Sequence, residues 1–455
     1  MADRTTQYPG HLAKLVASRL RSQHGSAPPE AALTRLLETL YFASLKTDEG
    51  RPTLCTVNYV DPEDVSSGSV AHAPADCWTL VPFDRPLPFD VRTLTKLARA
   101  ADPSVSSLAV YRDRRNKLFI WAMVDQEDRR SDYIALDAAD SAERPGLFQA
   151  TITGAGNISV YQNDALIGSL EQHTLVEEYH DVLWSGPVHD LLVGYLRNYL
   201  AETGLKASEH VAPAEFEDEL LMRWLNAICR ILMSIQHYRH GGGLLITPEM
   251  TLDGLNVKYT IRYDRLLRSL RTMIESQFLA SSIAAQGEPA SNGAQHLLPY
   301  AMRDSDLAHR SLGEHKSEVL GAIRFIASLS CVDGFVLLDR QMVVHGFGVE
   351  VRTDNLLSDI HVARDSGANP KLLRQAELTQ YGTRHRAMMR YCYDKPGSLG
   401  LVVSQDGDIR AMTRIADMLV LWENIDVQLA YRPGNVSAPG DHQGPILRRV
   451  NTRVA

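Results

Sequence analysis

Two short segments of the sequence combine residue types that could bind a phosphorylated ligand and a metal ion. In the first, CVDGFVLL at 331–338, an acidic residue and a glycine precede an apolar run. The carboxylate of Asp333 could hold a hard cation such as Mg²⁺ or Mn²⁺ through oxygen, and Gly334 would let backbone or ligand approach closely. The same pair before an apolar strand is also typical of a simple turn, so this segment alone leaves both interpretations open.

The second segment, YGTRHRAMM at 381–389, has the pattern of a helix start with Gly382 or Thr383 at its cap. Exposed backbone N–H groups at a helix start bind anions, and the helix dipole favours negative charge there. The side-chain donors follow in three consecutive residues: Arg384, His385 and Arg386. Donors that point in several directions suit a triphosphate, whereas the alternative is a solvated basic turn.

Together, the two segments resemble the DGA and RHR motifs of diadenylate cyclases of the DNA-integrity-scanning type. The strand-like GLVVSQDGDI at 400–409 resembles the downstream V-V-S segment of that family. The similarity is clear from Leu320 to Leu421 and extends more weakly back to a helix that begins at Ala214. Enzymes of this family join two ATP molecules into cyclic di-AMP through 3′,5′ linkages and release pyrophosphate.

The resemblance implies a role for each matching residue. Asp333 would coordinate Mg²⁺ or Mn²⁺ near the attacking 3′-hydroxyl, and Asp406 would be a second metal ligand. The implied catalytic residues are Asp333, Arg384, His385 and Arg386. The implied substrate-binding residues are Gly334, Phe335, Gly382, Thr383 and Ser404. Nucleotidyl transfer depends mainly on positioning and charge stabilisation, which these residue types supply without a covalent nucleophile.

The resemblance also implies partners and regulation. In this family two domains face each other, each presenting one ATP, so we expect ATP as the substrate and a homodimer or larger homo-oligomer with facing active sites. Domains that precede such modules often resemble sensors. Residues 30–205 are similar to the sensor domains found in that position, so we expect them to regulate the activity.

The sequence departs from the family pattern at two places. Phe335 stands where the family usually has a small residue, and its ring could either stack on adenine or crowd it. Gln405 and Asp406 leave one carboxylate where the family tends to show an acidic pair. These departures favour the alternative function, a catalytically inactive sensor of a nucleotide or cyclic dinucleotide. The HGFG segment at 345–348 could line a ribose or base pocket, or form a glycine-rich turn.

The elements that must position these residues follow from hydrophobic periodicity. Apolar residues recur with a period near 3.6 over 214–237, which predicts a long helix. Further strands are predicted at 244–246, 255–263 and 334–338, and further helices at 264–278 and 314–329. The Ala-, Ser- and Gly-rich stretch at 280–294 predicts a mobile loop. This alternation favours an α/β fold, a mixed sheet flanked by helices.

We divide the chain into two α/β domains joined by a helical segment, because 455 residues exceed one ordinary core. The predicted parts are a flexible N-terminus at 1–29, a sensor domain at 30–205, a nucleotide-binding domain at 214–430 and a disordered tail at 431–455. The tail is rich in proline and glycine and has no periodicity.

Composition narrows the function classes. A formal net charge of −8 argues against nucleic acid as a partner, because phosphate binding usually shows as an excess of Lys and Arg. No apolar run approaches the roughly 18 residues of a membrane span, and Met1–Gln23 lacks the apolar core of a signal peptide. The five cysteines are scattered and never spaced as C-x-x-C, so we predict reduced thiols and neither a zinc site nor a disulfide framework. We therefore expect no membrane partner and a cytoplasmic location.

Overall fold

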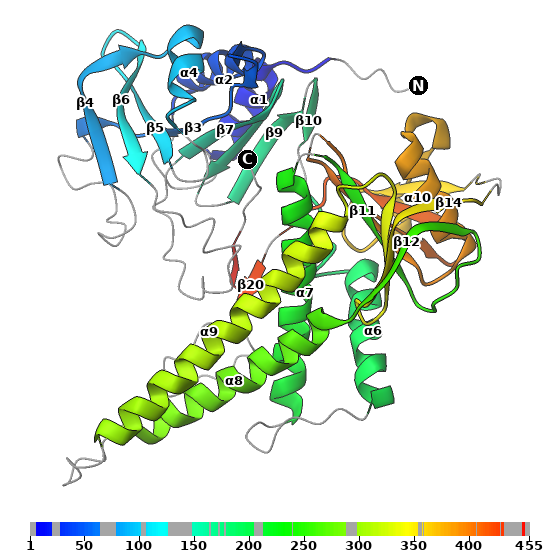
Figure 1. Ribbon diagram of the computed structural model, residues 1–455. Helices are drawn as coiled ribbons and strands as arrows, with labels where there is room; N and C mark the ends of the chain where they lie inside the picture. The colour runs from blue at the N-terminus through cyan, green and yellow to red at the C-terminus, as the bar shows by residue number, and fades with distance from the viewer. Residues whose placement is uncertain are drawn as a thin grey trace. The chain divides into compact units, whose positions relative to one another are not determined.

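The computed structural model of the protein divides into two compact units (Figure 1). One unit comprises Met1–Tyr179 and Arg432–Ala455, and the other comprises His180–Tyr431. The residues that the structure describes are 6–20, 28–63, 79–101, 106–125, 148–162, 165–171, 173–176, 179–203, 213–238, 240–287, 298–353, 357, 359–405, 407–427, 429–431 and 448–450.

A mixed sheet forms the centre of the first unit. Its strands are β3 (Thr56–Tyr59), β4 (Thr79–Pro88), β5 (Ser106–Arg112), β6 (Leu118–Asp125), β7 (Phe148–Gly154), β8 (Asn157–Gln162), β9 (Ala165–Glu171) and β10 (Thr174–Val176). Their order is β10-β9-β8-β7-β3-β5-β6-β4, with β3 and β5 parallel and the other neighbours antiparallel. A separate short ribbon joins β1 (Thr47–Asp48) to β2 (Arg51–Pro52).

Three helices contribute to the core of this unit: α1 (Pro9–Leu20), α2 (Glu30–Ser44) and α4 (Val91–Leu97). Fully buried leucines of α2, among them Leu33 and Leu37, join Val57 of β3 in one apolar cluster. The prediction of a flexible segment at 1–29 is wrong for α1, because its apolar residues recur on one face and bury Leu12 and Val16 in the same cluster.

Helices dominate the first half of the second unit (Figure 1). They are α6 (Pro187–Thr203), α7 (Pro213–Tyr238), α8 (Arg265–Gly287) and α9 (Leu298–Leu329). The helix predicted at 214–237 is confirmed by α7, in which Trp224 is fully buried. Helix α8 continues to Gly287, so the loop prediction for 280–294 is wrong up to that residue, and 288–297 lie outside the described residues.

A second mixed sheet lies in this unit. Its strands are β11 (Gly242–Thr247), β12 (Leu255–Tyr263), β13 (Phe335–Asp339), β14 (Val344–Val351), β15 (Ile360–Ala363), β16 (Arg374–Ala376), β17 (Leu399–Val403), β18 (Ile409–Ile415) and β19 (Met418–Trp422). Their order is β12-β14-β13-β11-β17-β18-β19-β15-β16. The pairs β11–β13 and β15–β19 are parallel and the remaining neighbours are antiparallel. Mixed sheets flanked by helices confirm the predicted α/β class.

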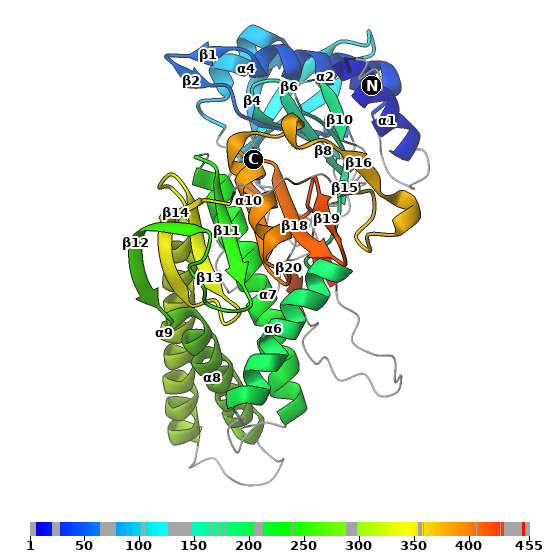
Figure 2. The ribbon, with the colours of Figure 1, turned by 90° about the vertical axis from the view of Figure 1, so that its right-hand side faces the viewer.

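Helices cover the two faces of this sheet (Figure 2). Helix α10 (Thr383–Asp394) packs on one face, where Met388 fills the space above Gly400 of β17. On the other face Ile235 of α7 and Ser330, which follows α9, close around Gly242 of β11. Short 3-10 turns, η2 (Pro370–Leu372) and η3 (Leu378–Gln380), lead from β15 to α10.

Strand register brings three chain segments to one edge of the sheet. Leu244 of β11 pairs in parallel with Val336 of β13, so both strands begin at that edge. Val403 of β17 pairs with Gly242, so β17 ends at the same edge. The segments before β11, before β13 and after β17 therefore meet there, which is where the sequence places Asp333 and Ser404.

Two further boundaries differ from the predicted domains. The second unit begins at His180, so α6 groups with it, although the sequence placed residues up to 205 in the sensor domain. Beyond β20 (Leu429–Tyr431), only the strand β21 (Arg448–Val450) of the predicted tail is described, and the rest of 432–455 lies outside the described residues. No helix within the described ranges is long and apolar enough to span a membrane.

Candidate functional site

The two segments that resemble the family motifs meet in the folded chain. Arg384, in the first turn of α10, lies with Nη2 at 3.5 Å from Oδ1 of Asp333, which precedes β13. The carboxylate is 87% exposed and the guanidinium side chain 28% exposed. Ligand or metal could therefore reach the Asp333 carboxylate from solvent, while the arginine side chain is largely buried.

The Asp333 turn depends on its glycine. Gly334 has a φ of +117°, and a Cβ there would lie 2.5 Å from the carbonyl carbon of Gly348 in β14. Only glycine tolerates this backbone conformation and this approach without strain. Gly334 thus shapes the turn that presents Asp333, and the predicted contact of Gly334 with substrate stays a prediction.

The start of α10 presents its backbone to solvent. Gly382 is the N-cap residue with extended backbone, and a Cβ there would contact nothing within 4 Å. The first helical hydrogen bond runs from the N–H of Arg386 to the carbonyl of Gly382 at 3.0 Å. Arg386 Nη2 also donates to Thr383 Oγ1 at 3.4 Å. Gly382 and Thr383 are thus exposed to solvent, and the binding of phosphate at this helix start stays a prediction.

The side chain of Arg384 lies against the backbone of Gly241, which precedes β11. A Cβ on Gly241, which has a φ of +70°, would sit 3.1 Å from Arg384 Nη1 and 3.2 Å from the N–H nitrogen of Gln405. The guanidinium therefore lies beside the segments before β11 and after β17 as well as Asp333. Its side chain thus lies between Asp333 and the backbone that precedes β11.

His385 points inward, away from the exposed face of the helix start. Its side chain is buried, and Nε2 accepts a hydrogen bond from Arg410 Nη1 at 3.1 Å. Burial, with Arg410 and Arg384 nearby, lowers the pKa of His385 from 6.5 to about 4. His385 is neutral near pH 7 and adds no positive charge there, and its implied catalytic role stays a prediction.

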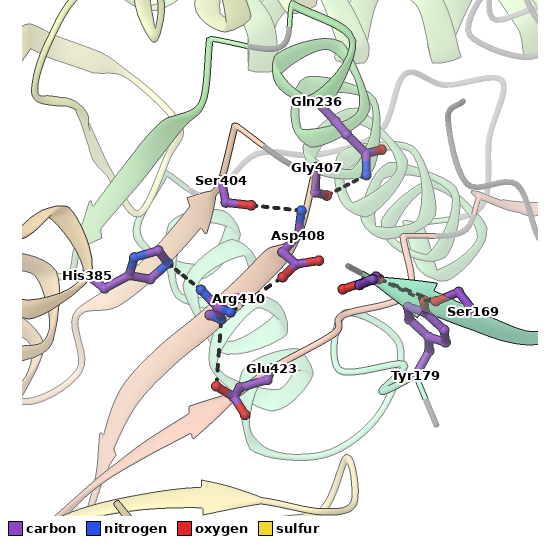
Figure 3. Close-up of polar contacts among 10 residues, drawn as sticks. Ser169, Tyr179, Gln236, His385, Ser404, Gly407, Asp408, Arg410 and Glu423 are labelled. Carbon is purple, nitrogen blue, oxygen red and sulfur yellow. Dashed lines mark hydrogen bonds and ion pairs between the residues drawn. The ribbon is translucent and has the colours of Figure 1, made fainter. Parts of the chain in front are cut away.

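Arg410 on β18 is the residue that sequence reasoning missed (Figure 3). It lies 3.4 Å from Asp408 Oδ2 and, through Nε, 3.8 Å from Glu423 Oε1, in addition to His385. All three partners are largely buried, so this ion-pair network fixes the inner side of the α10 start. The available sequence signal was the spacing of Asp408 and Arg410, two residues apart at the start of the predicted strand-turn segment.

Ser404 closes the turn between β17 and β18 (Figure 3). Its Oγ accepts from the N–H of Asp408 at 3.0 Å, and its own N–H donates to the Asp408 carbonyl at 2.8 Å. Gln236 at the end of α7 donates to the Gly407 carbonyl at 2.6 Å and anchors the same turn. The hydroxyl of Ser404 thus has a structural partner, and its contact with substrate stays a prediction.

Phe335 lies in the core. Its side chain is 3% exposed, and its ring packs so closely on Gly243 of β11 that a Cβ there would lie 2.8 Å from Cδ1. Stacking on adenine would require the ring to leave this contact. The bulky residue at this position is accommodated by the missing side chain of Gly243.

Among the described residues at this end of the sheet, the exposed carboxylate of Asp333, which also pairs with Arg384, is the candidate metal ligand. Asp406 lies outside the described residues, and Asp408 and Glu423 face Arg410. No group of three or more His, Cys, Asp or Glu side chains suited to a metal occurs in the described part of the chain. A single exposed carboxylate fits Mg²⁺ or Mn²⁺ that is bound mainly through substrate phosphates, which is the usual arrangement for Mg²⁺.

A separate pocket of about 210 Å³ lies near the opposite end of β13. It is lined by Tyr199, Leu220, Arg262, Asp264, Leu267, Arg268, Arg271, Gln341 and Val343. None of the residues predicted to bind substrate lines it. The candidate site is therefore defined by the sheet edge at Asp333 and not by this pocket.

Comparison with known sequences supports the N-terminal part of the chain. Residues 22–125 match the family described as "Probable sensor domain DACNV". No curated protein and no solved structure matches the chain. The sensor-type domain is thus supported by the sequence match, and the function of residues 180–431 rests on the geometry described above.

Proposed function

We propose that the protein is a diadenylate cyclase that condenses two ATP molecules into cyclic di-AMP with release of two pyrophosphates. The observation that supports the proposal most strongly is the ion pair between Asp333 and Arg384. It joins two segments that are distant in sequence and that match the family motifs. An exposed carboxylate and a largely buried guanidinium beside an exposed helix start are the parts that nucleotidyl transfer requires.

Each bond-forming step transfers one adenylyl group. The 3′-hydroxyl oxygen of one ATP attacks the α-phosphorus of the other, a new P–O bond forms, and the bond to the β-phosphate oxygen breaks to release pyrophosphate. Arg384 and the N–H groups at the start of α10 would hold the phosphates. When bound at Asp333, Mg²⁺ or Mn²⁺ would neutralise phosphate charge and favour ionisation of the hydroxyl.

Ring closure requires a second, facing nucleotide. One site holds one ATP, so two copies of the chain must present their sites to each other across a two-fold axis. We therefore propose a homodimer or larger homo-oligomer as the active form. The N-terminal sensor-type domain would regulate the activity, since a sensor attached to a cyclase can favour or disfavour the arrangement in which two active sites face each other.

The alternative is a catalytically inactive sensor of a nucleotide or cyclic dinucleotide. It is favoured by one observation, the scarcity of free carboxylates for metal among the described residues, where Arg410 engages both Asp408 and Glu423. In that case Arg384 would bind the phosphates of a ligand, but no phosphodiester bond would form.

Incubation of the purified full-length protein with ATP and Mn²⁺, followed by chromatography and mass spectrometry, separates the two functions. Cyclic di-AMP in the mixture, absent without Mn²⁺, is the expected result. ATP binding without any product would replace the cyclase by the sensor. Absence of both binding and product would remove the nucleotide site altogether.

A further inference from the structure

An exposed aromatic pair lies on the outer strands of the second sheet. Tyr259 of the edge strand β12 is directly opposite Phe347 of β14, and its side chain is 51% exposed. The two rings are stacked, with centroids 4.8 Å apart and an interplanar angle of 20°. The HGFG segment is thus part of a strand, and its phenylalanine supports a tyrosine that faces solvent.

The tyrosine ring lies beside the Asp333 turn. Gly348 has a φ of +63°, and a Cβ there would lie 3.3 Å from Tyr259 Cδ2 and 3.5 Å from the Asp333 carbonyl oxygen. Gly348 is also the residue whose backbone Gly334 approaches. Two glycines in contact therefore remove every side chain that could separate the ring from the turn that carries Asp333.

A cation adjoins the same place. Lys258, the neighbour of Tyr259, forms an ion pair with Glu350 at 2.7 Å. The hydrogen bond to Glu350 raises the pKa of Lys258, with a smaller contribution from the charge of Asp333. The backbone of Asp333 and the base of the Lys258 side chain thus lie near the ring, and both residues carry charges suited to phosphates and their metal.

We propose that Tyr259, backed by Phe347, stacks on the nucleobase of the bound nucleotide. The proposal rests on the proposed function, because it assumes that phosphates bind at Arg384. A base needs a flat apolar surface close to the phosphate site, and Phe335 cannot offer one because its ring packs against Gly243. Tyr259 offers a supported and accessible ring, and stacking on an aromatic ring contributes about 1–3 kcal/mol per base.

The competing explanation is structural. A stacked cross-strand pair stabilises the edge of a sheet by about 0.2–1 kcal/mol without any ligand. On that explanation a substitution of Tyr259 would change stability and affect all ligands alike. Base stacking instead predicts a loss confined to ligands that contain a base.

The test uses titration calorimetry to compare the binding of two ligands to the full-length protein. The ligands are ATP and inorganic tripolyphosphate, each with Mg²⁺. Tyr259→Ala is expected to weaken ATP binding on the order of tenfold and to leave tripolyphosphate binding unchanged. Tyr259→Phe keeps the ring and is expected to bind both ligands as the unchanged protein does. Tyr259→Leu, which keeps apolar volume without an aromatic face, covers the case in which the alanine variant fails to fold.

Distinct outcomes overturn distinct claims. ATP binding that is unchanged in Tyr259→Ala and Tyr259→Leu would overturn base stacking while leaving the nucleotide site in place. An equal loss for ATP and tripolyphosphate would also overturn it, in favour of the structural role of the pair. If the unchanged protein binds neither ligand, the proposed function itself fails.

Discussion

The two segments of the candidate site differ in what fixes them. The Asp333 turn is held by backbone contact, since Gly334 lies against Gly348 and no other residue fits there. The start of α10 is held by side chains, since His385 and Arg410 anchor it from within, while a Cβ added at Gly382 would meet open space. A motif read from sequence thus mixes residues that shape the site with residues that can touch a ligand.

The largest expected effect is a difference in stability between the alanine variants of Gly334 and Gly382. Gly334→Ala is expected to reduce the free energy of unfolding by about 2–4 kcal/mol, because a Cβ meets backbone atoms at a positive φ. Gly382→Ala should cost less than about 1 kcal/mol, as expected for an open N-cap position. Chemical denaturation of both variants measures the difference. Equal losses would show that the turn is not held by backbone contact.

Arg410 should matter more for stability than its partial exposure suggests. Arg410→Ala removes the shared partner of Asp408, Glu423 and His385 and is expected to cost about 2 kcal/mol in unfolding free energy. Arg410→Lys keeps the charge and should recover part of the loss. An alanine variant as stable as the unchanged protein would mean that the helix start needs no internal anchor.

Arg384 should affect binding and not folding. Arg384→Ala is expected to weaken ATP binding about tenfold, through the lost charge-assisted hydrogen bonds to phosphate. Arg268→Ala, which removes a surface arginine paired with Asp264, is the control and should bind ATP normally. Titration calorimetry measures both. Unchanged affinity in Arg384→Ala would remove this side chain from the phosphate site.

Because His385 is buried, it should make the stability of the protein depend on pH. Its pKa is about 4 when folded and ordinarily 6.5, so the unfolded chain takes up the proton first as the pH falls. Stability should therefore decline between about pH 6.5 and 4, at up to about 1 kcal/mol per pH unit. His385→Gln should lack this contribution to the slope. If the unfolding free energy of both proteins changed equally with pH across that range, the result would contradict a buried neutral histidine.

Sequence patterns located the elements whose periodicity is strong. The apolar residues that recur over 214–237 predicted the helix α7. The pattern at 255–263 predicted the strand β12 with the bounds that the structure has. The same periodicity is present in α1, where Leu12 and Val16 are buried, although residues 1–29 were predicted to be flexible. Periodicity depends on local geometry alone, so one sequence suffices to detect it.

The orientation of site side chains could not be predicted in this way. Whether His385 faces a phosphate or the interior depends on Arg410, which comes from another strand. Whether Phe335 meets a base depends on Gly243, far upstream in the chain. Such facts follow from contacts between elements, which neither spacing nor resemblance specifies.

The most direct test of the central claim is product formation by Asp333→Asn. The exposed carboxylate contributes little to folding, so the variant should keep its stability and bind ATP, yet form no cyclic di-AMP in the presence of Mn²⁺. Asp253→Asn is the matched control, because Asp253 is an exposed aspartate paired with Lys395 at the other end of α10. Loss of product in Asp333→Asn alone is the predicted result, and product formed by Asp333→Asn at the unchanged rate would contradict the claim.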